Sequence, residues 1–390
     1  MTISIMRSEF ESRLRKIQNV IGEAQADACI ITSPVNLFYL NGFIFDGYMY
    51  IRPENEPVLF VKRPHGVKAE NVFYIRKPEQ MPEMLQQKNF PLPEKILVEA
   101  DSMVFSSAVR LQNALGNPQL INVSAKIREL RSVKSDYELA QMRECAAIHT
   151  TVYEEIPGLY REGMTDIELQ IEIERVMRLH GSMGIFRAFG ENMEIFMGSL
   201  LAGNNAQTAS PYDFALGGRG LSPLLPIGSS GVKLEKGTTF MVDMAGNFRP
   251  WMSDMSRTFA IGKADKKAYD AHQVSMEMNH WVSENVKPGT ACAAIYDYSL
   301  ATAKKHGLES YFMGTKQQAR FVGHGLGLEI NEPPVLTPRS REILQPGMAF
   351  AYEPKFVLPG IGPVGIENTF IVEQNGVENI TLCEEKLITL

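Results

Sequence analysis

The sequence predicts an α+β protein in which a smaller mixed α/β domain, residues 1–125, precedes a larger domain, residues 126–390. Three observations support this prediction. A chain of 390 residues, 44% of them hydrophobic, is too long for one ordinary domain. Its first third alternates helical and strand-like patterns. From Gly237 onward, long antiparallel strands occur in two pairs with helices between them, which is typical of an α+β domain.

The amino-terminal domain begins with an amphipathic helix. Apolar residues at helical spacing predict this helix over residues 10–26. Short apolar runs predict strands at residues 28–32, 48–52, 57–61 and 95–100. The middle two of these strands form a hairpin around an ENE turn. We also expect a turn at residues 33–36, because the segment SPVN is rich in turn-forming residues.

Helices open the second domain. Residues 127–146 are charged, helix-forming and carry an apolar stripe, and we place the domain boundary beside them. Thr165 and Glu168 have the spacing of a capping box, which predicts a helix that ends at Gly181. A Gly-, Pro- and Ser-rich stretch predicts a loop at residues 202–231. Further strands are expected at residues 238–248, 251–262, 349–360 and 364–376, and further helices at 265–286 and 291–305.

Two aspartates interrupt the first pair of strands. Asp243 and Asp254 lie at equal distances from the centre of the GNFRPW turn, between Phe248 and Arg249. Residues at equal distances from the turn of an antiparallel hairpin lie opposite each other. We therefore expect the two carboxylates to face each other, roughly 5 Å apart at Cβ.

Two glutamates occupy the second pair of strands in the same way. Glu353 and Glu367 are equidistant from Gly360 in the VLPGIGP turn. His324, in the segment GHGLGLE, adds an imidazole where neighbouring glycines leave little side-chain bulk. Each of these residues taken alone is readily explained as an ordinary turn, strand-end or solvated residue, so the prediction depends on their joint pattern.

The joint pattern predicts a metal centre. Four carboxylates in a sheet core repel one another and lose hydration, and divalent cations relieve that cost. The expected ligands are Asp243, Asp254, His324, Glu353 and Glu367. Oxygen ligands with one imidazole favour two divalent ions of Mn, Co, Fe or Zn over Ca or Cu. We also expect Arg257 to hold one of the metal-binding carboxylates.

Composition narrows the function classes. The net charge of −6 argues against a broadly basic nucleic-acid binder. Four cysteines lie far apart without CxxC spacing, which argues against a zinc ribbon, a thioredoxin motif or a disulfide scaffold. The opening segment lacks the apolar core of a signal peptide, and no apolar run is long enough to span a membrane. We expect a cytoplasmic protein without nucleic-acid or membrane partners.

The ordered motifs resemble those of the pita-bread metallohydrolases, the M24 peptidase class that includes prolidase, aminopeptidase P, methionine aminopeptidase and creatinase. The segments that carry this resemblance are VDMAGNFRPWMSDMSRTFAIG, GHGLGLEINEPP, GMAFAYEP and GIENTFIV. Upstream, SPVNLFYLNGF resembles the creatinase/prolidase amino-terminal domain. The resemblance covers nearly the whole chain. It implies that residues 126–390 form a pita-bread catalytic domain with antiparallel sheets and flanking helices.

The resemblance implies a dinuclear metal-dependent hydrolase of a C–N amide bond, similar to Xaa-Pro dipeptidases and aminopeptidases. By this resemblance Asp243 binds the second metal ion, and Asp254 and Glu367 bridge both ions. His324 and Glu353 complete the first site, and Glu353 is the general base. The implied substrate is a small peptide or peptide-like compound. The implied assembly is a homodimer, because the amino-terminal domain in this family often reaches toward a partner's active site.

Three residues outside the ligand set depart from the peptidase pattern. Tyr212 or Asp213 stands near the position of one expected histidine, and Asn331 replaces a second. Gly365 replaces the arginine that precedes the last glutamate motif. Asn331 donates hydrogen bonds but carries no proton at neutral pH. We expect Asn331 to be a catalytic and substrate-binding residue and Tyr212 to bind substrate.

Two alternative functions remain open at this stage. A non-peptide hydrolase of a small cyclic amidine or amide, similar to ectoine hydrolase, would account for complete ligands beside altered outer residues. A non-catalytic pita-bread module that binds another macromolecule is the second alternative. The complete ligand set favours an enzyme over a binding module.

Overall fold

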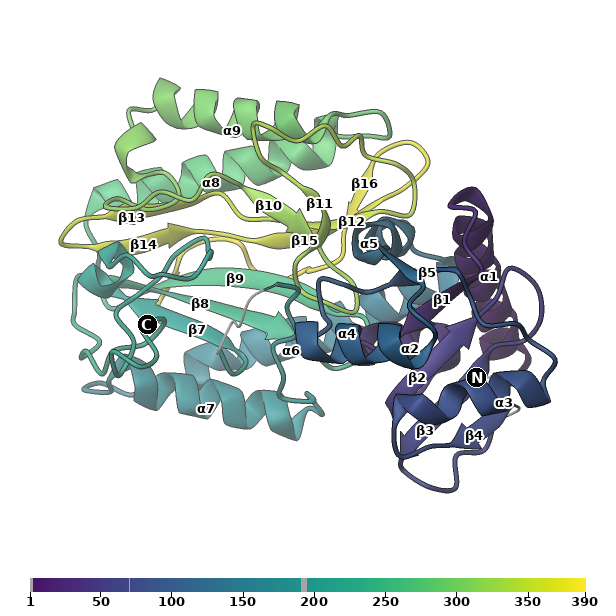
Figure 1. Ribbon diagram of the computed structural model, residues 1–390. Coiled ribbons are helices and arrows are strands. Elements are labelled where there is room, and N and C mark those ends of the chain that lie inside the picture. Colours follow the sequence, from purple (N-terminus) through teal and green to yellow (C-terminus); the bar gives the residue numbers. More distant parts are fainter. Residues whose placement is uncertain (1–2, 70, 191–194) are drawn as a thin grey trace. The chain divides into compact units, whose positions relative to one another are not determined.

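The computed structural model describes residues 3–69, 71–190 and 195–390, and the side chains of residues 3–6 are excepted. The chain divides into two compact units, Met1–Leu130 and Arg131–Leu390 (Figure 1). The boundary expected from the sequence lies between residues 125 and 126. Both positions fall within helix α5 (Ser124–Ser132), so the chain passes from one unit to the other inside a helix.

The amino-terminal unit is built on a mixed six-stranded sheet of order β4-β3-β2-β1-β5-β6. Strand β2 is antiparallel to β1 and β3, and the other neighbours are parallel. The strands are β1 (Ala28–Ile31), β2 (Asp46–Ile51), β3 (Val58–Arg63), β4 (Val72–Tyr74), β5 (Lys95–Val98) and β6 (Gln119–Asn122). The helices are α1 (Ile3–Glu23), α2 (Pro34–Asn41), α3 (Met81–Gln87) and α4 (Phe105–Ala114), with the 3-10 turn η1 (Pro78–Gln80). This mixture of strands and helices confirms the predicted α/β character.

The prediction of a turn after β1 is wrong, because helix α2 begins there. The Ser33 side chain caps the helix by accepting a hydrogen bond from the Asn36 N–H. Pro34 occupies the first turn, where a missing N–H costs nothing. The helix ends at Gly42, whose φ of 82° suits a residue without a Cβ. Ser and Pro therefore start a helix here, since an apolar stretch follows them instead of a polar one.

The described part of the carboxyl-terminal unit contains three sheets, antiparallel except for the pair β17–β9. One sheet, of order β17-β9-β8-β7, contains β7 (Gly198–Ala202), β8 (Thr239–Gly246), β9 (Ser253–Ala260) and β17 (Ile388–Thr389). The second, of order β11-β10-β12-β15-β16, contains β10 (Gly323–Gly325), β11 (Glu332–Val335), β12 (Ala349–Tyr352), β15 (Asn368–Val372) and β16 (Val377–Asn379). The third is the hairpin of β13 (Lys355–Leu358) and β14 (Gly362–Gly365).

Two pairs of helices flank these sheets on opposite sides (Figure 1). Helices α6 (Asp136–Leu159) and α7 (Asp166–Leu179) pack on the sheet of β7, β8 and β9, over one buried apolar cluster. Helices α8 (Lys266–Asn285) and α9 (Cys292–Lys305) lie over a second cluster beside β12 to β15. Short 3-10 turns are η2 (Gly203–Gln207) and η3 (Glu309–Tyr311). The capping box predicted at Thr165 and Glu168 is confirmed at the start of α7. Over the described residues, no helix has both the length and the apolar composition needed to cross a membrane.

The register of β8 and β9 differs from the expected one by two residues. Asp243 pairs with Ser256, and Asp254 pairs with Ala245, so the two aspartates are not directly opposite. The ladder runs to the pair Gly246–Ser253, which moves the centre of the turn one residue later than the sequence suggested. Because side chains alternate along a strand, a shift of two residues keeps both aspartates on one face.

The register of the second carboxylate pair agrees with the prediction. The ladder of β12 with β15 ends at the pair Tyr352–Asn368, and the hairpin of β13 with β14 begins at Lys355–Gly365. Glu353 and Glu367 lie in the gap between these two ladders, in matching positions. Leaving the ladder at this point frees the two side chains to meet the first sheet, and Glu367 forms an isolated bridge with Ser256 of β9.

Candidate metal centre

All five expected ligands converge between the two larger sheets of the carboxyl-terminal unit. Strands β8 and β9 supply the aspartates, β10 supplies the histidine, and the gap between the β12–β15 ladder and the β13–β14 hairpin supplies the glutamates. Their ligand atoms form two groups, and within each group the atoms lie within 4.8 Å of one another. The first group is Asp254, His324 and Glu367, and the second is Asp243, Glu353 and Glu367. Glu367 belongs to both groups, so it joins them into one centre.

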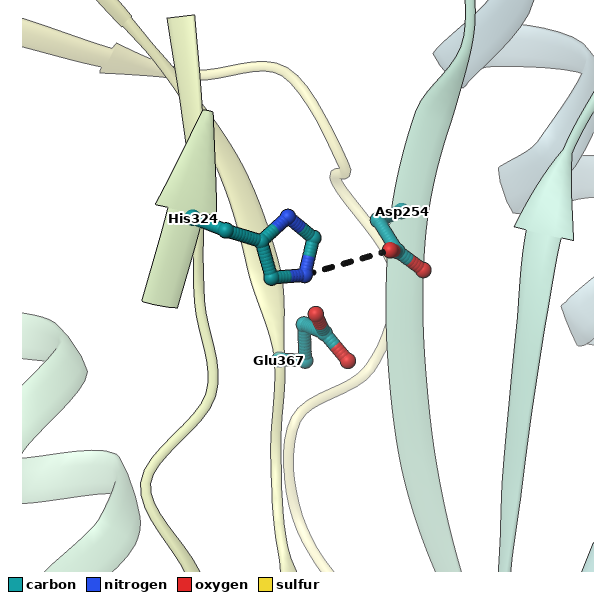
Figure 2. A group of neighbouring side chains, drawn as sticks. All are labelled: Asp254, His324 and Glu367. Carbon is teal, nitrogen blue, oxygen red and sulfur yellow. Dashed lines mark ion pairs between the residues drawn. The ribbon is translucent and has the colours of Figure 1, made fainter. Parts of the chain in front are cut away.

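The first group presents open ligand atoms to a common point (Figure 2). His324 Nε2 lies 3.8 Å from Asp254 Oδ2 and 3.6 Å from Glu353 Oε1. Nδ1 of His324 lies 3.2 Å from the carbonyl oxygen of Gly325, to which it donates when protonated. That bond favours the tautomer in which Nε2 keeps its lone pair for a metal ion.

The glycines around His324 are required by the close packing of β10 between β11 and β12. A Cβ at Gly323 would lie 2.2 Å from the carbonyl oxygen of Ala351. A Cβ at Gly325 would lie 2.1 Å from the carbonyl oxygen of Pro333. The two glycines of the GHG motif therefore allow the histidine strand to pack closely against both neighbouring strands, with the imidazole beside the carboxylates.

The second group already surrounds a cation, the side chain of Lys355. Its ammonium nitrogen lies 2.7 Å from Glu353 Oε2, 2.8 Å from Asp243 Oδ2 and 3.0 Å from Glu367 Oε2. The Lys355 side chain is fully buried. The sequence reasoning missed this residue. A signal was present, because Lys355 follows Glu353 by two residues and such residues share one face of an extended segment.

The electrostatics of the centre favour the binding of positive charge. Burial raises the pKa of Glu367 to about 7, and the nearby Glu353 and Asp243 carboxylates add to the rise. Burial and the Glu367 carboxylate raise the pKa of Asp254 well above its usual range. Burial alone would lower the pKa of Lys355, but the surrounding carboxylates outweigh it and raise that pKa. Carboxylates with such pKa values are stabilised as anions when a further cation binds.

The residues present fit a divalent cation at the first group. Glu367 Oε1 is a buried oxygen that has no hydrogen-bond partner within the described structure. Its other oxygen, Oε2, accepts from Lys355 Nζ and from Ser256 Oγ at 2.6 Å. A buried carboxylate oxygen without a partner is costly, and a metal ion that also contacts Asp254 and His324 would remove that cost.

Arg257 does not hold a metal-binding carboxylate, so that expectation is wrong. Its buried guanidinium donates to the carbonyl oxygen of Glu367 at 2.7 Å and to Asn368 Oδ1 at 2.8 Å. It also donates to the carbonyl oxygens of Ser256 and of the carboxyl-terminal segment near Glu384. Arg257 therefore fixes the backbone that carries Glu367 and acts on the centre only through that backbone.

A cavity of about 610 Å³ opens directly above the ligands. Its walls are mainly apolar and aromatic, with Phe186, Phe189, Phe214, Phe321 and Ile330 among the lining residues. Tyr212 and Asn331 also line it, and their contact with substrate stays a prediction. A largely apolar cavity with a few convergent polar groups is typical of a small-molecule site.

The side chain of Asn331 is engaged by the cavity wall. Its Oδ1 accepts from the Phe189 N–H at 2.6 Å, and its Nδ2 donates to the Phe189 carbonyl oxygen at 2.8 Å. Both ends of the amide thus bind one backbone unit. This geometry favours a positioning role for Asn331 over the catalytic role expected from the sequence.

The backbone conformation and its close neighbours explain why position 365 is a glycine. Its φ is +136°, and a Cβ there would lie 2.6 Å from the carbonyl oxygen of Pro354 and 3.0 Å from Lys355 Cα. A side chain at this position therefore cannot be accommodated without moving the strand. Lys355 pairs with Gly365 directly across the β13–β14 ladder.

Comparisons with known proteins agree with this geometry. Residues 140–374 match the model of metallopeptidase family M24, and residues 13–133 match the creatinase/prolidase N-terminal domain. The Bacillus subtilis protein named uncharacterized peptidase YqhT is 26% identical over 402 residues, covering 97% of this chain and all of the relative. The putative dipeptidase YkvY of the same organism is 24% identical and covers 97% of this chain and all of the relative. Among solved structures, a Xaa-Pro dipeptidase from Bacillus anthracis superposes with a TM-score of 0.80 at 23% identity, covering 98% of this chain and all of the other.

Proposed function

Because the chain belongs to metallopeptidase family M24 and carries a creatinase/prolidase N-terminal domain, we propose that it hydrolyses a C–N amide bond in a small peptide or peptide-like compound with the help of divalent metal. The observation that carries the proposal is the convergence of Asp254, His324 and Glu367 at the floor of an apolar cavity. The buried Oε1 of Glu367, which has no hydrogen-bond partner within the described structure, supports a cation at this position.

The residues of the first group would hold the metal ion. The chemistry that a divalent cation supplies at such a site is polarisation of the amide carbonyl and acidification of water. The Nε2 atom of His324 and the open oxygens of Asp254 and Glu367 are the donors, a set suited to Mn, Co, Fe or Zn. Manganese is the ion that we propose to test first, because oxygen donors outnumber the single imidazole.

We propose that Glu353 moves the proton of the reaction. Its Oε2 is bound to Lys355, while its Oε1 faces the first group, 3.6 Å from His324 Nε2. Burial raises the pKa of the Glu353 carboxyl above its usual range, and Lys355 opposes that rise. In the proposed reaction Glu353 Oε1 takes a proton from the attacking water and delivers it to the leaving nitrogen.

The cavity supports a proposal for the class of substrate. Aromatic side chains on several walls would bind an apolar or cyclic side chain next to the scissile bond, as in a Xaa-Pro dipeptide. The similarity to a protein named as a Xaa-Pro dipeptidase supports this choice of substrate for the first assays. Tyr212 would bind the peptide backbone through its hydroxyl, and Asn331 would hold the Phe189 wall in place.

Metal-dependent turnover of a substrate panel tests the proposal. The purified chain is stripped with a chelator, reloaded with Mn²⁺, Co²⁺, Fe²⁺ or Zn²⁺, and assayed against Xaa-Pro dipeptides, longer Xaa-Pro peptides, other dipeptides and cyclic amidines. We expect turnover of dipeptides with an apolar first residue, lost in Asp254→Asn and retained in the surface control Asp270→Asn, whose carboxylate pairs with Lys266. Turnover of cyclic amidines alone would replace the peptidase assignment, and no metal-dependent turnover of any substrate would refute it.

The assembly and compartment are proposals as well. We propose a cytoplasmic homodimer, in line with the resemblance noted in the sequence. Light scattering of the full chain tests the dimer, and a monomer at working concentration would refute it. Two metal ions per centre were also expected from the sequence, and the position of Lys355 bears directly on that number.

A further inference from the structure

We infer that the Lys355 ammonium takes the place of one metal ion, so that the centre binds a single divalent ion at Asp254, His324 and Glu367. The inference rests on the proposed metal-dependent function and specifies its cofactor. It replaces the expectation of two exchangeable metal ions with one exchangeable ion and one cation that is part of the chain.

The ammonium occupies the position that a second ion would need. Its nitrogen is 2.7–3.0 Å from three carboxylate oxygens, one from each member of the second group. A lysine ammonium has three N–H donors, and the three carboxylates use all of them. A metal ion would require the same oxygens at about 2.0–2.2 Å. The ammonium and a metal ion therefore exclude each other from the second group.

The backbone of Lys355 is fixed on both sides. Lys355 pairs with Gly365 at the start of the β13–β14 hairpin. Its carbonyl oxygen accepts from the Met313 N–H at 2.8 Å. The side chain has no exposed surface, so the ammonium is held among the carboxylates without contact to bulk solvent. Displacement by an incoming ion would separate the ammonium from the carboxylates that compensate its charge, which is unfavourable.

Gly365 supports the same assignment from the opposite strand. Directly paired residues of an antiparallel ladder project their side chains from the same face. Gly365 has none, and the backbone there has no room for a Cβ. The Lys355 side chain is therefore the cation that this pair of strands supplies to the centre.

The two groups differ in what they lack. In the second group the ammonium satisfies one oxygen of each carboxylate. In the first group Glu367 Oε1 is buried without a partner, and His324 Nε2 faces the Asp254 and Glu353 oxygens at 3.6–3.8 Å, too far for hydrogen bonds. One group has its cation and the other has open donors. The ammonium and a single divalent ion together offset three of the four carboxylate charges, whereas a second ion would stand next to the ammonium.

Metal stoichiometry tests the inference directly. Wild type, Lys355→Ala, Lys355→Met and the control Lys266→Ala are dialysed against excess Mn²⁺ and then washed, and bound metal is measured by mass spectrometry. Lys266 is an exposed lysine that pairs with Asp270, so it controls for loss of a positive charge. Electron paramagnetic resonance distinguishes an isolated Mn²⁺ from two ions about 3.5–4 Å apart, which couple magnetically.

We expect one ion per chain with an uncoupled spectrum in wild type and Lys266→Ala, and two ions with a coupled spectrum in Lys355→Ala. Lys355→Met is expected to stay at one ion, because its side chain fills the space without charge. Two ions in wild type, or no gain in a folded Lys355→Ala, would overturn the inference.

Anomalous diffraction from wild-type crystals grown with Mn²⁺ gives a second test that needs no variant. We expect a peak among Asp254, His324 and Glu367, and none between Asp243 and Glu353. A peak at the latter position would overturn the inference and leave the proposed function intact. If neither wild type nor Lys355→Ala binds Mn²⁺, the inference and the proposed metal-dependent function are both rejected. The gain of one ion in Lys355→Ala tests the inference, and the turnover of wild type tests the proposed function.

Discussion

A buried ion-pair cluster behind the cavity wall gives the sharpest stability prediction. Glu332 accepts a hydrogen bond from Arg131, lies 3.3 Å from Lys134 Nζ, and accepts from the Glu329 N–H at 3.1 Å. All three charged side chains of Arg131, Lys134 and Glu332 are at most 2% exposed. Glu332 follows Asn331 and lies on β11 beside the histidine strand, so its loss would disturb the wall of the proposed active site.

We predict that Glu332→Gln lowers the free energy of unfolding by about 3–5 kcal/mol, the cost of leaving buried charges without their partner. For a unit of this size that loss corresponds to a fall of roughly 6–20 °C in Tm. The change keeps the volume of the side chain, so cavity formation does not contribute. Calorimetry and urea denaturation of the full chain measure the loss.

The pH dependence provides a check on the cause. Burial raises the pKa of Glu332, but Arg131 and Lys134 outweigh burial, and the net effect lowers that pKa. A lowered folded pKa means that the stabilisation is complete above about pH 4.3, the ordinary glutamate value, and is lost as pH falls through the folded pKa. The difference between wild type and Glu332→Gln should therefore be constant at neutral pH and shrink in acid.

Glu329→Gln is the matched control. Glu329 lies 2.8 Å from Arg131, but its side chain is 9% exposed, and Glu332 remains to pair with both cations. We expect a clearly smaller loss for this variant. Equal losses for the two glutamines, or a loss under 1 kcal/mol for Glu332→Gln, would refute the assignment of Glu332 as the main counter-ion.

Three further predictions concern the centre. Glu353→Gln should retain bound metal and lose most turnover, because Asp254, His324 and Glu367 do not change; unchanged turnover would remove Glu353 from the proton-transfer role. Asn331→Ala frees the Phe189 backbone from two hydrogen bonds and should raise KM more than it lowers kcat; a fall in kcat alone would point to a catalytic amide instead. Removal of metal with a chelator should abolish turnover but leave the circular dichroism spectrum intact, because Lys355 keeps the carboxylates of the second group hydrogen-bonded; unfolding on chelation would contradict that role.

Much of the fold could be read from the sequence because local signals agreed with the final packing. The capping box at Thr165 and the turn at Gly360 each act over a few residues, and both were located correctly. The α2 helix was missed because Ser33 and Pro34 serve equally well in turns and at helix starts, and the apolar stretch that follows them is what favours the helix here.

The register of β8 and β9 shows a different kind of limit. Symmetry about a turn identifies opposite residues only when the centre of the turn is known. The loop between Gly246 and Ser253 contains six residues, and its centre depends on how far the ladder continues. The sequence placed that centre one residue early, which moved every pairing by two positions. The prediction that both aspartates share one face of the sheet was still correct, because side chains alternate along a strand with a period of two residues.

Lys355 shows what a motif comparison leaves out. The five ligand-type residues were found because each belongs to a recognised pattern, and attention to missing residues led to Asn331 and Gly365. Lys355 is a residue added to the centre, and a search for missing motif residues does not detect an added one. Side chains alternate along an extended segment, so residue 355 lies on the same side as Glu353. A lysine side chain at this position therefore points either into the acidic centre or away from it. Full burial of its side chain shows that it enters.

A cation that belongs to the chain differs physically from a bound ion. It needs no free metal in solution, it cannot be removed by a chelator, and it contributes one positive charge instead of two. All three of its donors are used by Asp243, Glu353 and Glu367, so it has none left for a substrate oxygen. The ammonium therefore serves to hold the carboxylates, and in the proposed reaction the polarisation of a substrate carbonyl would fall to the first group alone. The proposed hydrolytic reaction would then depend on one metal position, with Lys355 keeping Glu353 and Glu367 in place beside it.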